Sequence, residues 1–222
     1  DDAEAIRSLL RSKASLNRGP DGYDAPLHYA AMFGNTAAAR VLIDAKAKLN
    51  ITDNHMSTPL HYAVMYGHSA MLQLLVDSKA NTGAKTERGG RALDIALERR
   101  DLAAVSTLID AKAAVDAVNE DRETPLHCAF DSFCDAAVNM LIDAKAPVNA
   151  RDRIKRTPLH CAVEYGDASA IQALLDASAS VSVADKKGRT PLHWACVKGQ
   201  VVSVELLLAA KADFRVKDAN SV

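Results

Sequence analysis

A proline that recurs every 33 residues is the feature that most constrains how this chain can fold. Proline occupies five of the six positions in this register: Pro26, Pro59, Pro125, Pro158 and Pro191. Ala92 stands at the one position where the proline is missing, and a leucine follows all six positions. A fixed period in this range is typical of solenoids, in which each module packs only against its neighbours. The period therefore predicts a stack of similar modules, a type of protein that usually functions by presenting a surface.

The bulk composition excludes several other classes of protein. The formal net charge is -1, so no overall field favours nucleic acid or an anionic membrane as a partner. No apolar run approaches the roughly 20 residues that a membrane-spanning helix needs, and no signal-peptide pattern is present. The four cysteines contain no Cys-x-x-Cys pair, which favours free thiols in a reducing, intracellular setting (cytoplasm or nucleus).

The segment 53–85 shows how one module is built. Thr58 suits a helix N-cap, where its hydroxyl can accept a hydrogen bond from an amide of the first turn. Pro59 then begins a short helix at the position where its missing N–H costs nothing, and Gly67 ends that helix. A second helix is predicted over about 69–77, because its apolar residues fall on one face. Two positions hold the same residue in all six copies: Ala30, Ala63, Ala96, Ala129, Ala162 and Ala195, and Leu42, Leu75, Leu108, Leu141, Leu174 and Leu207.

On these residues the chain resembles the ankyrin repeat family. The family pattern is carried by Thr58-Pro59-Leu60-His61-Tyr62-Ala63 and by the matching segments that begin at Thr124, Thr157 and Thr190. The resemblance implies an all-α solenoid of stacked helix-turn-helix units, with β-hairpin or loop fingers that project from the stack. It implies one ankyrin repeat domain over 1–222, with complete repeats at 20–52, 53–85, 86–118, 119–151, 152–184 and 185–217. Residues 1–19 match a partial repeat and 218–222 the start of another, so we expect a fragment of a longer protein.

Several positions depart from the repeat. The bend after the second helix, where the family usually has glycine, holds Lys46, Lys79, Lys112, Lys145, Ser178 and Lys211. A lysine near the C-terminal end of a helix interacts favourably with the helix dipole. In most repeats an aspartate two residues earlier leaves this edge of the stack nearly neutral in charge. We therefore expect no basic binding stripe. Phe133 replaces an inter-helix glycine and can be either a recognition anchor or a cover for its own helix. The Gly89-Gly90 pair lacks the rest of a phosphate loop and is interpreted as a flexible loop tip.

The histidines do not form a catalytic pattern. Five of them occupy the same repeat position, where an imidazole can tie the start of the helix to the loop: His28, His61, His127, His160 and His193. His55 and His68 are expected to be solvated. No metalloprotease, nucleophile-elbow, Walker or EF-hand motif is present, and an active site needs groups that converge on a pocket. We therefore predict no catalytic residue, no cofactor site and no metal site.

The resemblance also implies where a partner binds, namely the finger tips and the exposed side of the first helices. The helix-end candidates are Met32, Phe33, Met65, Tyr66, Arg99, Asp131, Tyr165 and Lys198. The first four would form an apolar, aromatic patch of the kind favoured in interface centres, although packing in the core is the alternative. The finger candidates are acidic at Glu120 and Asp121 and basic at Arg153, Arg156, Lys186, Lys187 and Arg189. Such charges are either plain solvated faces or blocks that orient an extended ligand.

These observations predict a non-catalytic scaffold that binds a protein or peptide segment along its concave groove and finger tips. The partner's apolar portion would lie on the early repeats and its acidic residues on the late ones. Nucleic acid and direct membrane insertion are not expected, and a monomer is the expected oligomeric state. The alternative is a regulatory or targeting segment of a larger enzyme, channel or bacterial effector, whose activity lies outside these residues.

Overall fold

A computed structural model of the chain describes residues 16–17, 24–132 and 134–219. This part of the chain contains twelve α-helices and no strand, and it divides into two compact units, Asp1–Ala114 and Val115–Val222. The helices of the first unit are α2 (Pro26–Met32), α3 (Thr36–Asp44), α4 (Pro59–Met65), α5 (Ser69–Asp77), α6 (Ala92–Glu98) and α7 (Leu102–Asp110). Those of the second unit are α8 (Pro125–Asp131), α9 (Asp135–Asp143), α10 (Pro158–Tyr165), α11 (Ala168–Asp176), α12 (Pro191–Val197) and α13 (Val201–Ala209). The helix-turn-helix prediction is confirmed, including the two helices expected within 53–85.

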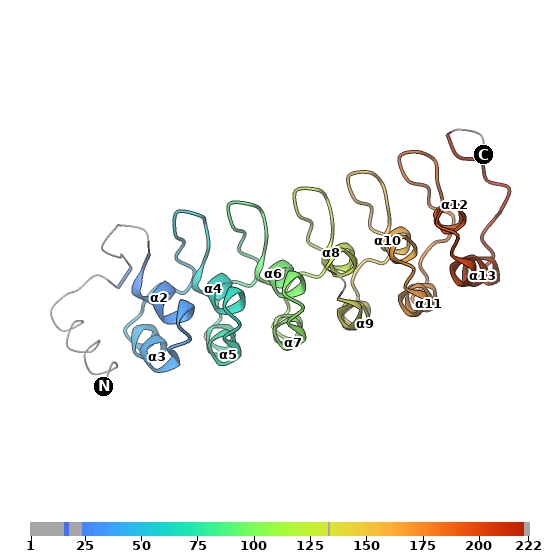
Figure 1. The fold of residues 1–222 in the computed structure, drawn as a ribbon. Helices are drawn as coiled ribbons and strands as arrows, with labels where there is room; N and C mark the ends of the chain where they lie inside the picture. Colours follow the sequence, from blue (N-terminus) through green and yellow to red (C-terminus); the bar gives the residue numbers. More distant parts are fainter. Residues whose placement is uncertain (1–15, 18–23, 133, 220–222) are drawn as a thin grey trace. The chain divides into compact units, whose positions relative to one another are not determined.

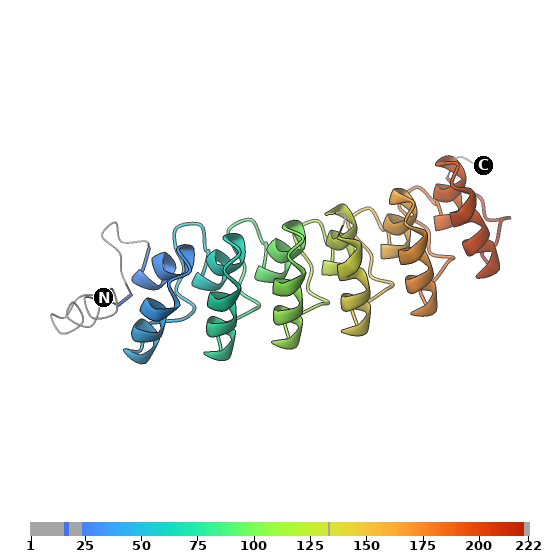
Figure 2. The ribbon, with the colours of Figure 1, turned by 60° about the horizontal axis from the view of Figure 1, so that its bottom comes forward.

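Within each unit the helices form two rows. In the first unit α2, α4 and α6 pack in one row and α3, α5 and α7 in the other (Figure 1). The second unit repeats this arrangement with α8, α10 and α12 in one row and α9, α11 and α13 in the other (Figure 2). The recurring alanines and leucines lie between these layers, and none of them is more than 6% exposed. Small side chains let the helices approach closely, while the leucines fill the space between successive pairs.

In most repeats a histidine fixes the start of the first helix through hydrogen bonds. The geometry of these bonds corrects one sequence prediction. In α4 the amide of Thr58 donates to Nδ1 of His61 at 3.0 Å, and the Thr58 hydroxyl lies 2.9 Å from the same nitrogen. Thr58 is therefore the N-cap residue of α4, as predicted, but its hydroxyl contacts the histidine and not an amide of the first turn. The other ring nitrogen, Nε2, lies 3.1 Å from the carbonyl oxygen of Ala84. The predicted role of the histidine, tying the helix to the loop, is confirmed.

The bends that follow the second helices adopt the left-handed conformation at a non-glycine residue. Lys46 and Lys79 both have φ of 70°, and Ser178 has φ of 65°. An L-residue in this region costs about 1–2 kcal/mol, which the surrounding helix packing offsets. The structure thus shows left-handed backbone at the position where the family usually has glycine.

The fingers are loops closed by turns. In the finger of residues 53–57 the amide of Asp53 donates to the carbonyl of Ser57 at 3.0 Å. Neighbouring fingers are joined by one backbone hydrogen bond, such as Glu87 N–H to His55 O at 2.7 Å in the first unit. The described residues contain no strand, so the hairpin part of the predicted fingers is realised as turns. These single bonds hold the finger tips side by side within a unit.

Two further predictions have outcomes in the structure. His68 is half-buried with Nε2 2.9 Å from the carbonyl oxygen of Met32, so the expectation that it is solvated was wrong. His55 is largely exposed, as expected. Phe133, most of the partial repeat at 1–19 and residues 220–222 lie outside the described residues.

Candidate functional site

The first unit contains a groove of about 550 Å³ between its fingers and its first-row helices. Its apolar surface comes from α2, from α4 with the residue that ends it, and from α6: Met32, Tyr62, Met65, Tyr66 and Ile95. The fingers of residues 53–57 and 86–90 supply the remaining wall. Concave sites of roughly 300–1,000 Å³ with mostly apolar lining are typical of ligand binding.

Contacts within the groove fix its aromatic wall. The Tyr62 hydroxyl donates to the Asp53 carboxylate at 2.9 Å, and the rings of Tyr62 and Tyr66 stack with centroids 6.1 Å apart. Asp53 also accepts from the amides of His55 and Ser57 at 2.8 and 2.7 Å. The finger and the first helix are therefore locked together, and Tyr66 remains 48% exposed above them.

The groove is lined by more negative than positive side chains. The carboxylates of Asp53, Glu87 and Glu98 line it together with one guanidinium, that of Arg88. Glu87 lies 3.2 Å from Nδ1 of His55, and both side chains are largely exposed. Glu98 ends α6 and is exposed.

Three of the predicted residues of the first unit line the groove, and two lie outside its lining. Met32, Met65 and Tyr66 belong to the wall. Phe33 directly follows α2 as its C-cap and is 72% exposed. Arg99 directly follows α6 as its C-cap and is exposed, and its Nη2 lies 3.5 Å from the position that a Cβ on Gly67 would occupy. The exposed positions of this patch are the Phe33, Met65 and Tyr66 side chains, whereas Met32 is half-buried.

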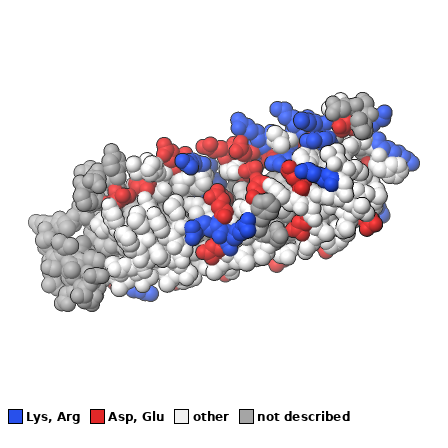
Figure 3. Space-filling model, viewed as in Figure 1, with Lys and Arg blue, Asp and Glu red and all other residues white. Residues whose placement is uncertain are grey.

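The fingers of the second unit carry a basic cluster, which we define as Arg151, Arg153, Lys155, Lys186 and Lys187. All five are exposed, and Figure 3 shows lysine and arginine side chains gathered on the finger side of this unit. Arg153 pairs with Asp121 of the preceding finger at 3.2 Å, but both side chains are more than 60% exposed. A pair this exposed contributes at most about 1 kcal/mol, so Arg153 stays available to a ligand. Glu120, next to Asp121, is exposed as well.

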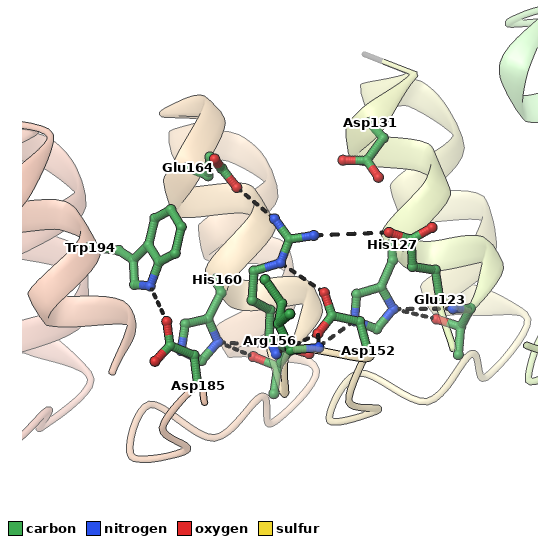
Figure 4. Close-up of polar contacts among 12 residues, drawn as sticks. Glu123, His127, Asp131, Asp152, Arg156, His160, Glu164, Asp185 and Trp194 are labelled. Atoms are coloured by element: carbon green, nitrogen blue, oxygen red, sulfur yellow. Dashed lines mark hydrogen bonds and ion pairs between the residues drawn. The ribbon is translucent and has the colours of Figure 1, made fainter. Parts of the chain in front are cut away.

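Arg156 belongs to a different environment from its neighbours in the sequence (Figure 4). Its Nε and Nη1 lie 2.8 Å from Asp152 and Glu164, and its Nη2 lies 3.9 Å from Glu123. Its side chain is only 16% exposed, and that of Asp152 only 3%. Arg156 therefore links two successive repeats, and we remove it from the proposed binding residues.

Arg189 is held in a similar way within its own finger. Its guanidinium donates to Asp185 at 2.8 Å and lies 4.3 Å above the ring of Trp194, whose Nε1 donates to the same carboxylate at 3.1 Å. These bonds lower the pKa of Asp185 even though burial alone would raise it. The arrangement resembles that of Tyr62 and Asp53 and fixes the finger to the helix.

The remaining helix-end candidates of the second unit are exposed. The Tyr165 hydroxyl donates to Asp131 at 3.0 Å across neighbouring repeats, and burial together with this bond raises the pKa of Tyr165 to about 12. Lys198 directly follows α12 as its C-cap and is exposed. These residues add polar side chains to the exposed surface of the unit.

Three of the recurring histidines have a lowered pKa because they are buried. Burial lowers the pKa of His61 and His127, and it lowers the pKa of His160 to about 4. In the part of the chain that the structure describes, no group of three or more histidine, cysteine or acidic side chains is placed to hold a metal ion. No described helix is long and apolar enough to cross a membrane.

Sequence reasoning missed several residues of the groove. Tyr62 and Asp53 stand nine residues apart, a spacing that recurs in Trp194 and Asp185, so the repeat register could have revealed them. His55 and Glu87 come from successive fingers and carried no comparable signal. Their contact depends on how the fingers meet in space.

Comparisons with known proteins agree with this geometry. A family model for ankyrin repeats (three copies) matches residues 1–86 and 135–218, and the chain therefore belongs to the ankyrin repeat family. Among solved structures, the ankyrin repeat domain of Bcl-3, a member of the IkappaB protein family, has a TM-score of 0.81 and 32% identity, covering 90% of this chain and 91% of that chain. The human ASB11 ankyrin repeat domain has a TM-score of 0.74 and 26% identity, covering 90% of this chain and 89% of that one. A comparison with curated proteins gave no match.

Proposed function

We propose that this chain is a non-catalytic binding module for segments of partner proteins. Ankyrin repeat domains are generally protein–protein interaction modules, and typically not enzymes. The observation that supports the proposal is that the positions used for packing differ from those that are exposed. The repeated alanines and leucines are buried in the stack, whereas Phe33, Tyr66 and Lys187 are exposed on helix ends and fingers.

Each unit supplies its own surface. The first offers the apolar helix ends Met32, Phe33, Met65 and Tyr66, and methionine and aromatic side chains are enriched in interface centres. The second offers the basic cluster on its fingers, which suits a segment with acidic residues and would accelerate its association. Arg99, Asp131, Tyr165 and Lys198, with Glu120 and Asp121, would contribute to the rims of these surfaces. We place the protein inside the cell, where ankyrin repeat domains commonly act and where its four cysteines would stay reduced.

Affinity purification from cell extract tests the proposal with matched variants. The wild-type chain, a Phe33→Ala, Tyr66→Ala double variant and a Lys186→Glu, Lys187→Glu double variant serve as baits. Gln73→Ala is the control, because Gln73 is exposed on α5 in the other row of helices. We expect proteins retained by the wild type and by the control to be lost from at least one of the double variants. If all baits retain the same proteins, the proposed surfaces are wrong.

A further inference from the structure

We propose that the groove of the first unit binds a partner segment in which an aliphatic or aromatic side chain stands next to a lysine or arginine. This inference rests on the proposed binding function and names the chemistry of one of its partners. Its basis is the pairing of an apolar wall with unbalanced negative charge in one concave site.

The apolar wall has room for a large side chain of the partner. Met65 and Tyr66 are 38% and 48% exposed, and Met32 and Ile95 stand on the neighbouring helices. Covering these surfaces removes apolar area from water at roughly 25 cal/mol per Å². Methionine adapts to the shape of an incoming side chain because it is unbranched and flexible.

The charged groups that line the same groove determine which residue of the partner is favoured next to that apolar side chain. Three carboxylates and one guanidinium line the groove, so a positive side chain is favoured over a negative one. Asp53 is already engaged by Tyr62 and by two finger amides, which leaves Glu98 and Glu87 as the carboxylates that a ligand can reach. Glu98 is exposed at the end of α6, where it can accept hydrogen bonds from an ammonium or guanidinium.

Lysine and arginine match this site in shape as well as in charge. Their aliphatic stems pack on apolar surface while the charged end reaches a polar rim. A stem lying along Met65 or Tyr66 would bring its charge toward the carboxylates at the edge of the groove. The same partner would be disfavoured by the basic cluster of the second unit, so the two surfaces select segments of opposite charge.

Selection from a displayed library of short random peptides tests this inference with the whole chain as target. We expect enriched peptides that combine an apolar residue with an adjacent lysine or arginine. A synthetic copy of one enriched peptide is then titrated against the wild type and against Glu98→Lys, Met65→Ser and Lys187→Glu. We expect Glu98→Lys to weaken binding by about tenfold at low salt, with a smaller effect at high salt, because screening reduces the lost attraction. Met65→Ser should also weaken binding, and Gln73→Ala on α5, titrated as the control, should leave it unchanged.

The outcomes separate this inference from the proposed function. Enriched peptides without positive charge, or an affinity that Glu98→Lys does not change, would overturn the inference and leave a binding function in place. A peptide whose affinity falls only with Lys187→Glu would do the same, since it binds the second unit. If neither unit enriches any peptide, both the inference and the proposed function fail. Circular dichroism of each variant checks that the helices are intact.

Discussion

Acidification should destabilise this protein through its buried histidines, and His160 allows the effect to be worked out. Its Nδ1 accepts a hydrogen bond from the Thr157 amide at 3.1 Å, so this nitrogen carries no proton. Its Nε2 lies 3.1 Å from the carbonyl oxygen of Arg189, to which it donates. Protonation would place two donors, Nδ1–H and the Thr157 amide, against each other inside the fold. The folded state therefore disfavours the imidazolium.

The magnitude follows from the pKa. Burial lowers the pKa of His160 from 6.5 to about 4, although the bond to the Arg189 carbonyl acts in the opposite direction. Because the folded pKa lies below the unfolded one, the unfolded state binds more protons between these two values. Stability is therefore complete above about pH 6.5 and falls as the pH drops toward 4. One residue with this shift costs about 2 kcal/mol at about pH 5 and about 3 kcal/mol when the titration is complete.

Urea denaturation followed by circular dichroism measures this dependence at a series of pH values. We compare the wild type with His160→Gln, which removes the titrating group. The variant should be less stable than the wild type near neutrality, and its stability should fall less steeply on acidification. His61 and His127 contribute in the same direction in both proteins, while the raised pKa of Glu123 acts in the opposite direction. Parallel stability curves for the two proteins would refute the assignment of a neutral, protonation-resistant His160.

Two further predictions use matched pairs of variants and the same unfolding measurement. Gly34→Ala should destabilise by about 2–3 kcal/mol, because the new Cβ would stand 2.7 Å from the His68 ring at a φ of +65°. Gly199→Ala, at φ +67° with no described atom within 4 Å, should cost only about 1 kcal/mol. Equal costs for the two glycine variants would show that the His68 ring moves aside without loss of stability. Arg156→Ala should cost about 3 kcal/mol, because it leaves the buried carboxylate of Asp152 without its charged partner. Arg153→Ala, whose ion pair is exposed, should cost less than about 1 kcal/mol, and a similar loss for both would remove the structural role given to Arg156.

The fold could be predicted from the sequence because its determinants are local and repeated. A threonine followed by proline and, two residues later, histidine begins each typical first helix, and a left-handed residue ends the second. Each repeat packs only on its neighbours, so a pattern within 33 residues is sufficient to describe the stack. Thr58 was predicted correctly as the N-cap, but the partner of its hydroxyl was not, because the sequence does not say which of two nearby groups the hydroxyl contacts.

The candidate sites were less accessible to sequence reasoning, because their chemistry depends on contacts between repeats. Arg153 and Arg156 stand three residues apart in one basic run, yet one is exposed and the other is enclosed by carboxylates. The difference arises because Arg156 lies where Glu164 and the preceding finger meet. Charge can be predicted from the residue type, whereas the availability of that charge follows from the register in which repeats stack.

This separation would allow one scaffold to carry the two proposed surfaces of opposite preference. The residues that hold the stack together, such as Leu75 and His61, are buried and repeat along the chain. Positions at helix ends and finger tips, such as Glu98 and Lys187, contribute little to packing, so their charge can differ from repeat to repeat at small cost in stability. Under the proposed function, partner selection would then depend on electrostatics over an apolar patch. Such selection acts mainly on association rates and weakens as ionic strength rises.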